Sequence, residues 1–327
     1  MATTKRAIAL LAASGHRLTL VDVGASLEPF LPFQPLLGQA TYVGFDPDLR
    51  EIHHRDDGSG KRIMVDKAVV VDPEASTVKF FLTRNPTCSS TLPPRSELAK
   101  SYVNAYRFEV VGTEEVEATT LDAAMDSVGV ERIDWIKLDT QGTDLRLLRS
   151  LGAARWATLM AVDAEPGFDQ HYEGEDTFGD LHREMLDRGY WLADLVLTQG
   201  VRLRPEVFDE SFRARRRPAR LAYEFNLKGS PTAAGPRYLR TVESLERSDA
   251  SREDYLRLWA CAFASGNHPY ALDVVAACEK AHGSDGDTAA LRALTVGRNR
   301  RDVVRNAWRL GQRVSLRNVR RLISKPY

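Results

Sequence analysis

The sequence predicts an α/β fold built around a mostly parallel sheet of the doubly wound type. Along about the first 230 residues of the 327-residue chain, short apolar runs alternate with segments of helical periodicity. Strands separated by helices of this length are typical of crossover units, which build parallel sheets. The expected strands cover residues 19–23, 40–45, 62–71, 78–83, 135–138, 159–162, 189–197 and 221–227, and the expected helices cover residues 27–37, 121–128, 144–151 and 178–188. The last two strands follow the final helix closely, so we expect them to pair antiparallel at one edge of the sheet.

The composition is that of a soluble protein with a substantial core. Hydrophobic residues make up 43% of the chain and charged residues 28%, and the formal net charge is zero. A neutral chain gives no general reason to expect a nucleic-acid partner. The three cysteines are widely separated, which indicates neither a disulfide framework nor a zinc site. Because no apolar run is long enough for a membrane span or a convincing signal peptide, we expect a cytoplasmic protein.

We expect two domains, at residues 1–229 and 230–327. A run rich in glycine and proline at residues 229–236 is typical of a linker between them. Strand signals disappear beyond it, and helical patterns take over. These patterns cover residues 255–264, 271–282, 289–293 and 303–323, of which the first two predict a helical hairpin.

The C-terminal end of the chain is strongly basic. Residues 298–327 carry nine arginines and one lysine but a single acidic residue, Asp302. Apolar residues at helical intervals among these cations predict an amphipathic helix. Such a helix either docks on the protein with its arginines in solvent or binds an anionic membrane or an acidic partner. We favour the docked helix, because Trp308 and its apolar neighbours suit burial.

The first strand ends in a glycine turn that is typical of a ligand site. Asp22, Gly24 and Ser26 lie at this turn, and Asp46 closes the second strand about 20 residues later. In a doubly wound sheet, such a turn lets a ligand approach the backbone, and the later carboxylate takes ribose hydroxyls. Backbone N–H groups at the start of a following helix would meet an anionic end of the ligand. The alternatives are an ordinary strand-to-helix turn and, for Asp46, a helix N-cap.

Two further strand ends carry candidate catalytic and substrate-binding groups. Asp139 ends the strand at residues 135–138, where open α/β sheets bind ligands, unless it only caps the following turn. After the strand at residues 159–162 comes a loop dense in ionisable groups, a feature more typical of function than of structure. The candidates in this loop for substrate contact or proton transfer are Glu165, His171, Tyr172 and Glu173.

Taken in order, these segments resemble the FkbM family of S-adenosylmethionine-dependent methyltransferases. The resemblance covers about residues 18–197 and depends on the order and spacing of several motifs, since no single motif is decisive. The motifs are Val21-Asp-Val-Gly-Ala25, Tyr42-Val-Gly-Phe-Asp-Pro47, Cys88-Ser-Ser-Thr-Leu92, Val116-Glu-Ala-Thr-Thr-Leu-Asp122, Asp134-Trp-Ile-Lys-Leu-Asp-Thr-Gln-Gly142, Tyr172-Glu-Gly174 and Gly189-Tyr-Trp-Leu-Ala-Asp194.

The resemblance implies a class I methyltransferase fold, which is Rossmann-like with helices on both faces of the sheet. It also implies S-adenosylmethionine as the methyl donor and O-methylation of a hydroxyl on a sugar, glycan or natural product. The residues that would form the site are, for the donor, Asp22, Gly24, Ser26, Asp46 and Asp139; for catalysis, Asp139 and His171; and for the acceptor, Glu165, Tyr172 and Glu173. We expect no metal ion in this site.

The sequence departs from the family pattern in three places. Ser26 and Glu28 replace the usual asparagine and second glycine of the turn, Asp46 replaces a glutamate, and Gln141 replaces an acidic residue. These departures leave two rival interpretations open. One is a catalytically degenerate domain that binds carbohydrate or a partner. The other is a domain that binds a nicotinamide dinucleotide, which is disfavoured because Glu28 would repel a pyrophosphate at the turn.

Overall fold

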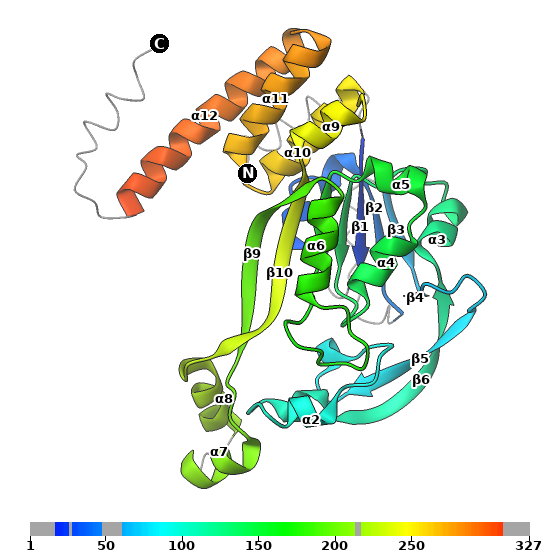
Figure 1. Cartoon of the computed structure of the whole chain (residues 1–327), viewed down its shortest axis with the longest axis vertical. Coiled ribbons are helices and arrows are strands. Elements are labelled where there is room, and N and C mark those ends of the chain that lie inside the picture. Colours follow the sequence, from blue (N-terminus) through cyan, green and yellow to red (C-terminus); the bar gives the residue numbers. More distant parts are fainter. Residues whose placement is uncertain (1–16, 26–27, 48–60, 213–216, 310–327) are drawn as a thin grey trace. The chain divides into compact units, whose positions relative to one another are not determined.

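The computed structural model describes residues 17–25, 28–47, 61–212 and 217–309 (Figure 1). These residues form two compact units, one at residues 18–241 and the other comprising Arg17 and residues 242–309. The expected boundary at 229/230 falls before the last strand of the first unit, and the two units divide after Thr241 instead. Ser26, which we predict to bind the methyl donor, lies outside the described residues.

A seven-stranded sheet organises the first unit, with the strand order β3–β2–β1–β7–β8–β10–β9 (Figure 1). Its strands are β1 (Leu18–Val23), β2 (Ala40–Phe45), β3 (Lys61–Val65), β7 (Trp135–Leu138), β8 (Ala161–Asp163), β9 (Tyr190–Gly200) and β10 (Ser230–Arg240). The first five strands in this order are parallel, whereas β10 runs antiparallel to both β8 and β9. This arrangement confirms the α/β class with a mostly parallel sheet. The strand order reverses between β1 and β7: β2 and β3 extend the sheet on the side of β1, and β8, β10 and β9 extend it on the side of β7.

Apolar strands fill the core of this sheet. All six residues of β1 and all four of β7 are buried, including Val21 and Leu138. Strands buried on both faces consist of continuous apolar runs, so the sequence marks them clearly. The helices of this part of the chain are α3 (Leu121–Ser127), α4 (Asp144–Ser150), α5 (Ala153–Thr158) and α6 (Phe178–Asp187). The side chains of Thr120 and Thr177 cap α3 and α6, which begin where the sequence predicts.

A second, three-stranded sheet holds β4 (Ala68–Val69), β6 (Val110–Thr119) and β5 (Thr77–Thr83), in that order. The single strand expected over residues 62–71 is divided between β3 of the large sheet and β4 of the small one. Strand β6 is not apparent from the sequence, because the exposed Glu114, Glu115 and Glu117 interrupt any apolar run. Between β5 and β6 the chain forms η4 (Pro86–Cys88), α2 (Ser96–Ala99) and η5 (Ala105–Phe108).

The segment expected to be an interdomain linker is strand β10, which corrects that prediction. Pro231 and Pro236 lie within β10 although proline lacks the N–H group that a ladder needs. Pro236 still contributes its carbonyl oxygen, which accepts a hydrogen bond from the backbone N–H of Ala164 over 3.3 Å. An antiparallel pair therefore does form at this edge of the sheet, but the partner of β9 is β10 rather than residues 221–227.

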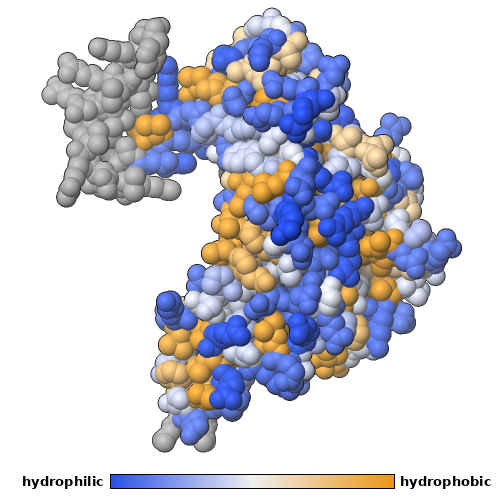
Figure 2. All heavy atoms as spheres, in the orientation of Figure 1, coloured by the Kyte–Doolittle hydropathy of each residue, from blue (hydrophilic) through white to orange (hydrophobic). Residues whose placement is uncertain are grey.

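Residues 221–226 belong to a helix that ends just before residue 227, so the strand expected at residues 221–227 is wrong. Between β9 and β10 the chain forms α7 (Pro205–Phe212) and α8 (Arg217–Asn226). The alternation of apolar and polar residues here is typical of a strand, but Leu221 and Phe225 are also spaced by one helical turn. Phe225 is 75% exposed, so it does not occupy the buried face that a strand would need. Apolar side chains are also exposed on β9, and Figure 2 shows hydrophobic surface along the β9–β10 ribbon and around α7 and α8.

Two 3-10 turns replace the helix expected at residues 27–37. These turns are η1 (Leu31–Phe33) and η2 (Leu37–Gln39). Pro29, Pro32 and Pro35 lack the backbone donors that an α-helix would need, so only short turns form.

The second unit is helical and contains α9 (Val242–Arg247), α10 (Arg252–Ala264), α11 (His268–His282) and α12 (Gly286–Arg309). Helices α10 and α11 form the expected hairpin, and the indole N–H of buried Trp259 donates to the hydroxyl of Thr295 on α12 over 3.0 Å. Helix α12 runs continuously through the gap expected after residue 293, while residues 310–323 of the expected terminal helix lie outside the described part of the chain. Of the helices described, none combines the length and apolarity that a membrane span requires.

Candidate functional site

The candidate site lies at the carboxyl ends of β1 and β7, where the strand order reverses. Open α/β sheets bind ligands in the crevice at this point. The two strand ends meet through Gly24, whose φ of +76° lies in the left-handed region. A Cβ atom at this position would lie 2.4 Å from the carbonyl oxygen of Asp139, so only glycine fits here.

The turn at Gly24 is tied to the end of β2. The backbone N–H groups of Gly24 and Ala25 both donate to the carbonyl oxygen of Phe45, each over 2.9 Å. Both donors are therefore satisfied within the protein. Asp46 directly follows Phe45, so these bonds also hold that carboxylate's backbone at the edge of the turn.

Lys137 connects the acidic residues of β1 and β7. Its Nζ lies 3.4 Å from Oδ1 of Asp22 and 3.6 Å from Oδ2 of Asp139, and it donates to the carbonyl oxygen of Gly24 over 3.1 Å. Burial alone would lower the pKa of Lys137, but the charges of Asp139 and Asp22 outweigh it and raise that pKa above its ordinary value. The ammonium group therefore stays charged and holds the two carboxylates together.

Asp22 is an internal anchor of the site. Its side chain is 1% exposed, and Oδ2 accepts hydrogen bonds from the backbone N–H of Phe30 (3.0 Å) and the hydroxyl of Tyr42 (3.1 Å). Burial raises the pKa of Asp22 above its ordinary value, against the opposing effect of Lys137. These bonds fasten the segment after the glycine turn to β2, so this predicted donor-binding residue shapes the turn from inside the protein.

Gln141 is held between Asp139 and Tyr172. Its Nε2 donates to Oδ1 of Asp139 over 2.6 Å, and its Oε1 accepts from the hydroxyl of Tyr172 over 3.0 Å. Its φ of +55° is unusual for a residue with a side chain, and the hydroxyl of Ser90 donates to its carbonyl oxygen over 2.8 Å. The amide at this position therefore orients Asp139, which an ionised glutamate could not do because it has no N–H to donate.

Glu165 follows β8 just as Asp139 follows β7. The two strands are parallel neighbours, and Lys137 and Asp163, each two residues earlier, are in register. The backbone N–H of Glu165 donates to Oδ2 of buried Asp144 over 2.8 Å, while the Glu165 side chain remains exposed to solvent. Desolvation by the surrounding protein and the charge of Asp139 raise the pKa of Glu165 to about 7, although Lys137 lowers it. Near neutral pH this carboxyl group therefore holds a proton part of the time.

The other three candidates of this loop have different surroundings. The buried ring of His171 stacks on Phe108 with centroids 5.7 Å apart, and burial lowers its pKa. Tyr172 is 2% exposed, and its hydroxyl lies 2.8 Å from the carbonyl oxygen of Cys88. Glu173 is exposed. His171 and Tyr172 thus hold the loop against the rest of the domain, and Glu173 faces solvent.

Three charged residues of the site are not apparent from the sequence: Lys137, Asp144 and Glu175. Oδ1 of buried Asp144 accepts a hydrogen bond from the hydroxyl of Thr140 over 2.5 Å. Glu175 accepts two backbone N–H groups of its own loop, each over 3.0 Å. The one available signal was the lysine inside the apolar strand at residues 135–138, because a charged residue in a buried strand needs a charged partner.

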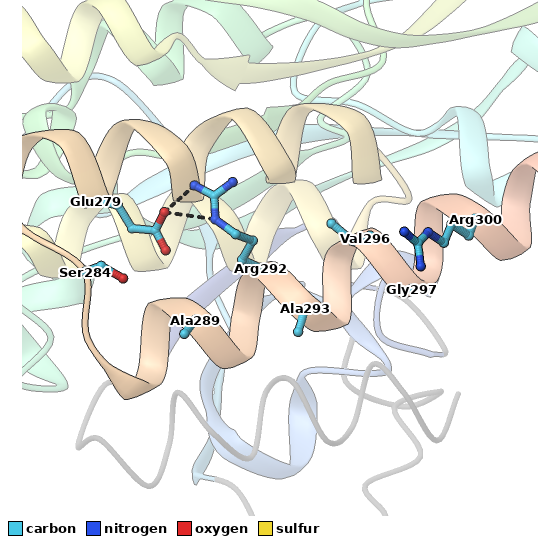
Figure 3. Close-up of a pocket in the computed structure, with 8 residues that line it drawn as sticks. All are labelled: Glu279, Ser284, Ala289, Arg292, Ala293, Val296, Gly297 and Arg300. Carbon is cyan, nitrogen blue, oxygen red and sulfur yellow. Dashed lines mark hydrogen bonds and ion pairs between the residues drawn. The ribbon is translucent and has the colours of Figure 1, made fainter. Parts of the chain in front are cut away.

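A surface hollow of about 540 Å³ lies in the helical unit (Figure 3). Its lining residues are Glu279, Ser284, Ala289, Arg292, Ala293, Val296, Gly297 and Arg300. Small side chains on one face of α12 create this hollow, and Nε of Arg292 donates to Oε2 of Glu279 over 2.9 Å. None of these lining residues belongs to a strand of the sheet. Among the residues that the structure describes, no three His, Cys, Asp or Glu side chains converge on a position for a metal ion.

The fold defines the class of this molecule, an α/β protein with a mostly parallel sheet. Residues 42–192 match the family model of the methyltransferase FkbM domain. Over these residues, the match confirms the resemblance to the FkbM methyltransferase family that the sequence motifs indicate. The match includes Asp46, Asp139 and Glu165 and begins after Gly24. Comparison with curated proteins and with solved structures gives no significant match.

Proposed function

We propose that this chain is an S-adenosylmethionine-dependent methyltransferase that methylates a hydroxyl group on a sugar, glycan or natural product. The observation that carries the proposal is the match to the methyltransferase FkbM domain, because it includes the ends of β2, β7 and β8 with Asp46, Asp139 and Glu165. The sheet order β3–β2–β1–β7–β8–β10–β9, with its antiparallel β10, supports the class I arrangement that the family resemblance implies. A cytoplasmic location remains part of the proposal.

The residues at the crevice fit an adenosine-type donor. The absence of a side chain at Gly24 lets the backbone at the end of β1 lie against that of Asp139, so the two strand ends that would flank the donor are close together. Asp46 stands at the end of the second strand, where a carboxylate in this kind of sheet accepts hydrogen bonds from ribose hydroxyls. Asp22 would act through the shape of the turn, and Ser26 is retained as a predicted contact.

The donor would supply an electrophilic methyl group on a sulfonium. The protein's share of the work is to place the acceptor hydroxyl in line with that methyl group and to manage its proton. Asp139 is suited to hold the hydroxyl, because Lys137 and Gln141 fix its carboxylate at the end of β7. Glu173 is exposed at the same loop as Glu165 and remains a proposed acceptor contact, whereas His171 and Tyr172 would shape the loop.

The test is a methyl-transfer assay with tritium-labelled S-adenosylmethionine and a panel of sugars, glycans and hydroxylated natural products. We expect label to pass to a hydroxylated acceptor and S-adenosylhomocysteine to inhibit the transfer. Binding of S-adenosylhomocysteine without transfer to any hydroxylated compound would instead favour the degenerate binding domain.

A further inference from the structure

The register of β7 and β8 places Asp139 and Glu165 at the ends of two neighbouring strands. Lys137 pairs with Asp163 across these parallel strands, and Asp139 and Glu165 follow them at the same spacing. Asp139 directly follows β7 and Glu165 lies two residues past β8, and Nζ of Lys137 is 3.6 Å from Oδ2 of Asp139. The mutual charge effect of Asp139 and Glu165 agrees with this placement.

The two carboxylates have different supports. Asp139 contacts the ammonium of Lys137 (3.6 Å) and receives a hydrogen bond from Gln141 (2.6 Å), so its carboxylate is held in place from two sides. Glu165 is fixed through its backbone N–H, which donates to Asp144, so its carboxylate is left accessible to solvent. A carboxyl group with a pKa near neutrality is suited to accept a proton, and burial together with the charge of Asp139 raises the pKa of Glu165 to about 7.

We propose that Asp139 and Glu165 act as a pair in which Asp139 orients the acceptor hydroxyl and Glu165 accepts its proton. This inference rests on the proposed function and adds to it the residue that receives the proton. The acceptor oxygen forms a bond to the methyl carbon as the carbon–sulfur bond breaks, and the electron pair of that bond returns to sulfur. The hydroxyl proton passes to a carboxylate oxygen of Glu165 and then to solvent.

The charged groups that face Glu165 set the pH range of this step. They are Asp139 and Lys137 at the end of β7, Asp144 at the start of α4 and Asp163 on β8. Desolvation by the surrounding protein, together with the charges of the three aspartates, raises the pKa of Glu165 to about 7, while Lys137 lowers it. The proton-accepting form should therefore appear as the pH rises through about 7, and the rate of transfer should rise with it.

The first test needs no acceptor. Between about pH 5.5 and pH 8.5, native Glu165 becomes ionised next to Asp139, whereas in the unfolded chain it is already ionised at the lower pH. Wild-type protein should therefore lose stability over this range relative to Glu165→Gln. From the lower to the higher pH, we expect the melting temperature of Glu165→Gln to rise by on the order of 2–4 °C relative to that of wild type. The exposed Glu131, replaced by Gln, should show no such gain. A difference between Glu165→Gln and wild type that does not change with pH would overturn the pair.

The second test follows the reaction with the acceptor found in the labelled-donor assay. Glu165→Gln should slow transfer by ~10²–10⁴ and abolish the rise in rate near pH 7, whereas Glu165→Asp should recover part of the rate with the pH dependence intact. S-adenosylhomocysteine should bind both variants as it binds wild type. A Glu165→Gln rate with the wild-type pH profile would overturn the inference. Absence of S-adenosylhomocysteine binding to wild type would overturn the proposed function. The melting experiment would still test the pairing of Asp139 and Glu165, because it needs neither donor nor acceptor.

Discussion

The backbone of Gly24 lies directly against the carbonyl group of Asp139, so that a Cβ atom at position 24 would come within 2.4 Å of that oxygen. This contact joins the ends of β1 and β7 at the point where the strand order reverses. The residue that turns the chain and the carboxylate that would meet the acceptor therefore share one rigid junction. A substitution at either residue should therefore shift the backbone of the other.

Replacing Gly24 by Ala should destabilise the protein by roughly 2–4 kcal/mol, because left-handed strain and the clash with Asp139 add together. Urea unfolding measures the effect. Gly129→Ala is the matched control, since Gly129 also has a positive φ (+68°) but has open space where a Cβ would lie. That control should cost only about 1–2 kcal/mol. Equal costs for the two variants would mean that the junction with Asp139 is not tight.

Replacing Lys137 by Met should destabilise the protein by about 3–5 kcal/mol, because Asp22 and Asp139 would lose their shared cation. The loss should be larger at pH 8 than at pH 5. Burial already raises the pKa of Asp22, and without Lys137 this carboxyl would accept a proton more readily at the lower pH. Lys67→Met removes an exposed ion pair with Glu117 and should cost less than about 1 kcal/mol. A pH-independent loss for Lys137→Met would contradict this account of the buried charges.

Replacing Asp139 by Asn should slow methyl transfer by ~10²–10⁴ while S-adenosylhomocysteine binding changes only a few-fold. The reason is that, in the proposed function, Asp139 holds the acceptor hydroxyl, and Gln141 fixes its carboxylate. A chelator should leave the wild-type rate unchanged, since the proposed chemistry uses carboxylates. An undiminished rate for Asp139→Asn would remove this residue from the mechanism, and activity that returns only with added magnesium would contradict the metal-free reaction.

The basic C-terminal segment should not float with anionic vesicles at low salt if it forms a docked helix, as we favour. Liposome flotation with phosphatidylserine-containing vesicles tests this expectation on the full chain. Replacement of Arg313, Arg317, Arg320 and Arg321 by Gln gives the matched comparison. Flotation of the wild type that these substitutions abolish would contradict the docked helix and establish a membrane contact.

The sequence predicts the central strands well because their residues are buried on both faces. The strand at residues 135–138 matches β7 in both of its bounds, and Asp139 follows it as expected. Strand β10 is misjudged because Pro231 and Pro236 are local signals of a break, whereas its place in the sheet depends on pairing with distant β8 and β9.

The candidate site is predicted in part, because strand ends can be read from the sequence but contacts across strands cannot. Asp46, Asp139 and Glu165 are found by their positions after apolar runs. The link from Lys137 to Asp22 spans residues far apart in the chain and depends on the register of β1 and β7. Sequence position likewise did not distinguish the accessible Glu165 from the buried His171, although both belong to one loop.

The central claim is that the crevice binds an adenosine-type methyl donor, and isothermal calorimetry with S-adenosylhomocysteine tests it most directly. Wild type should bind S-adenosylhomocysteine and should not bind NAD. Asp46→Ala should weaken the binding by about 1.5–3 kcal/mol, which is roughly a 10–150-fold rise in Kd. Asp66→Ala, which removes an exposed carboxylate just after β3, should bind like wild type. Binding of NAD without S-adenosylhomocysteine, or equal affinity for wild type and Asp46→Ala, would contradict the account.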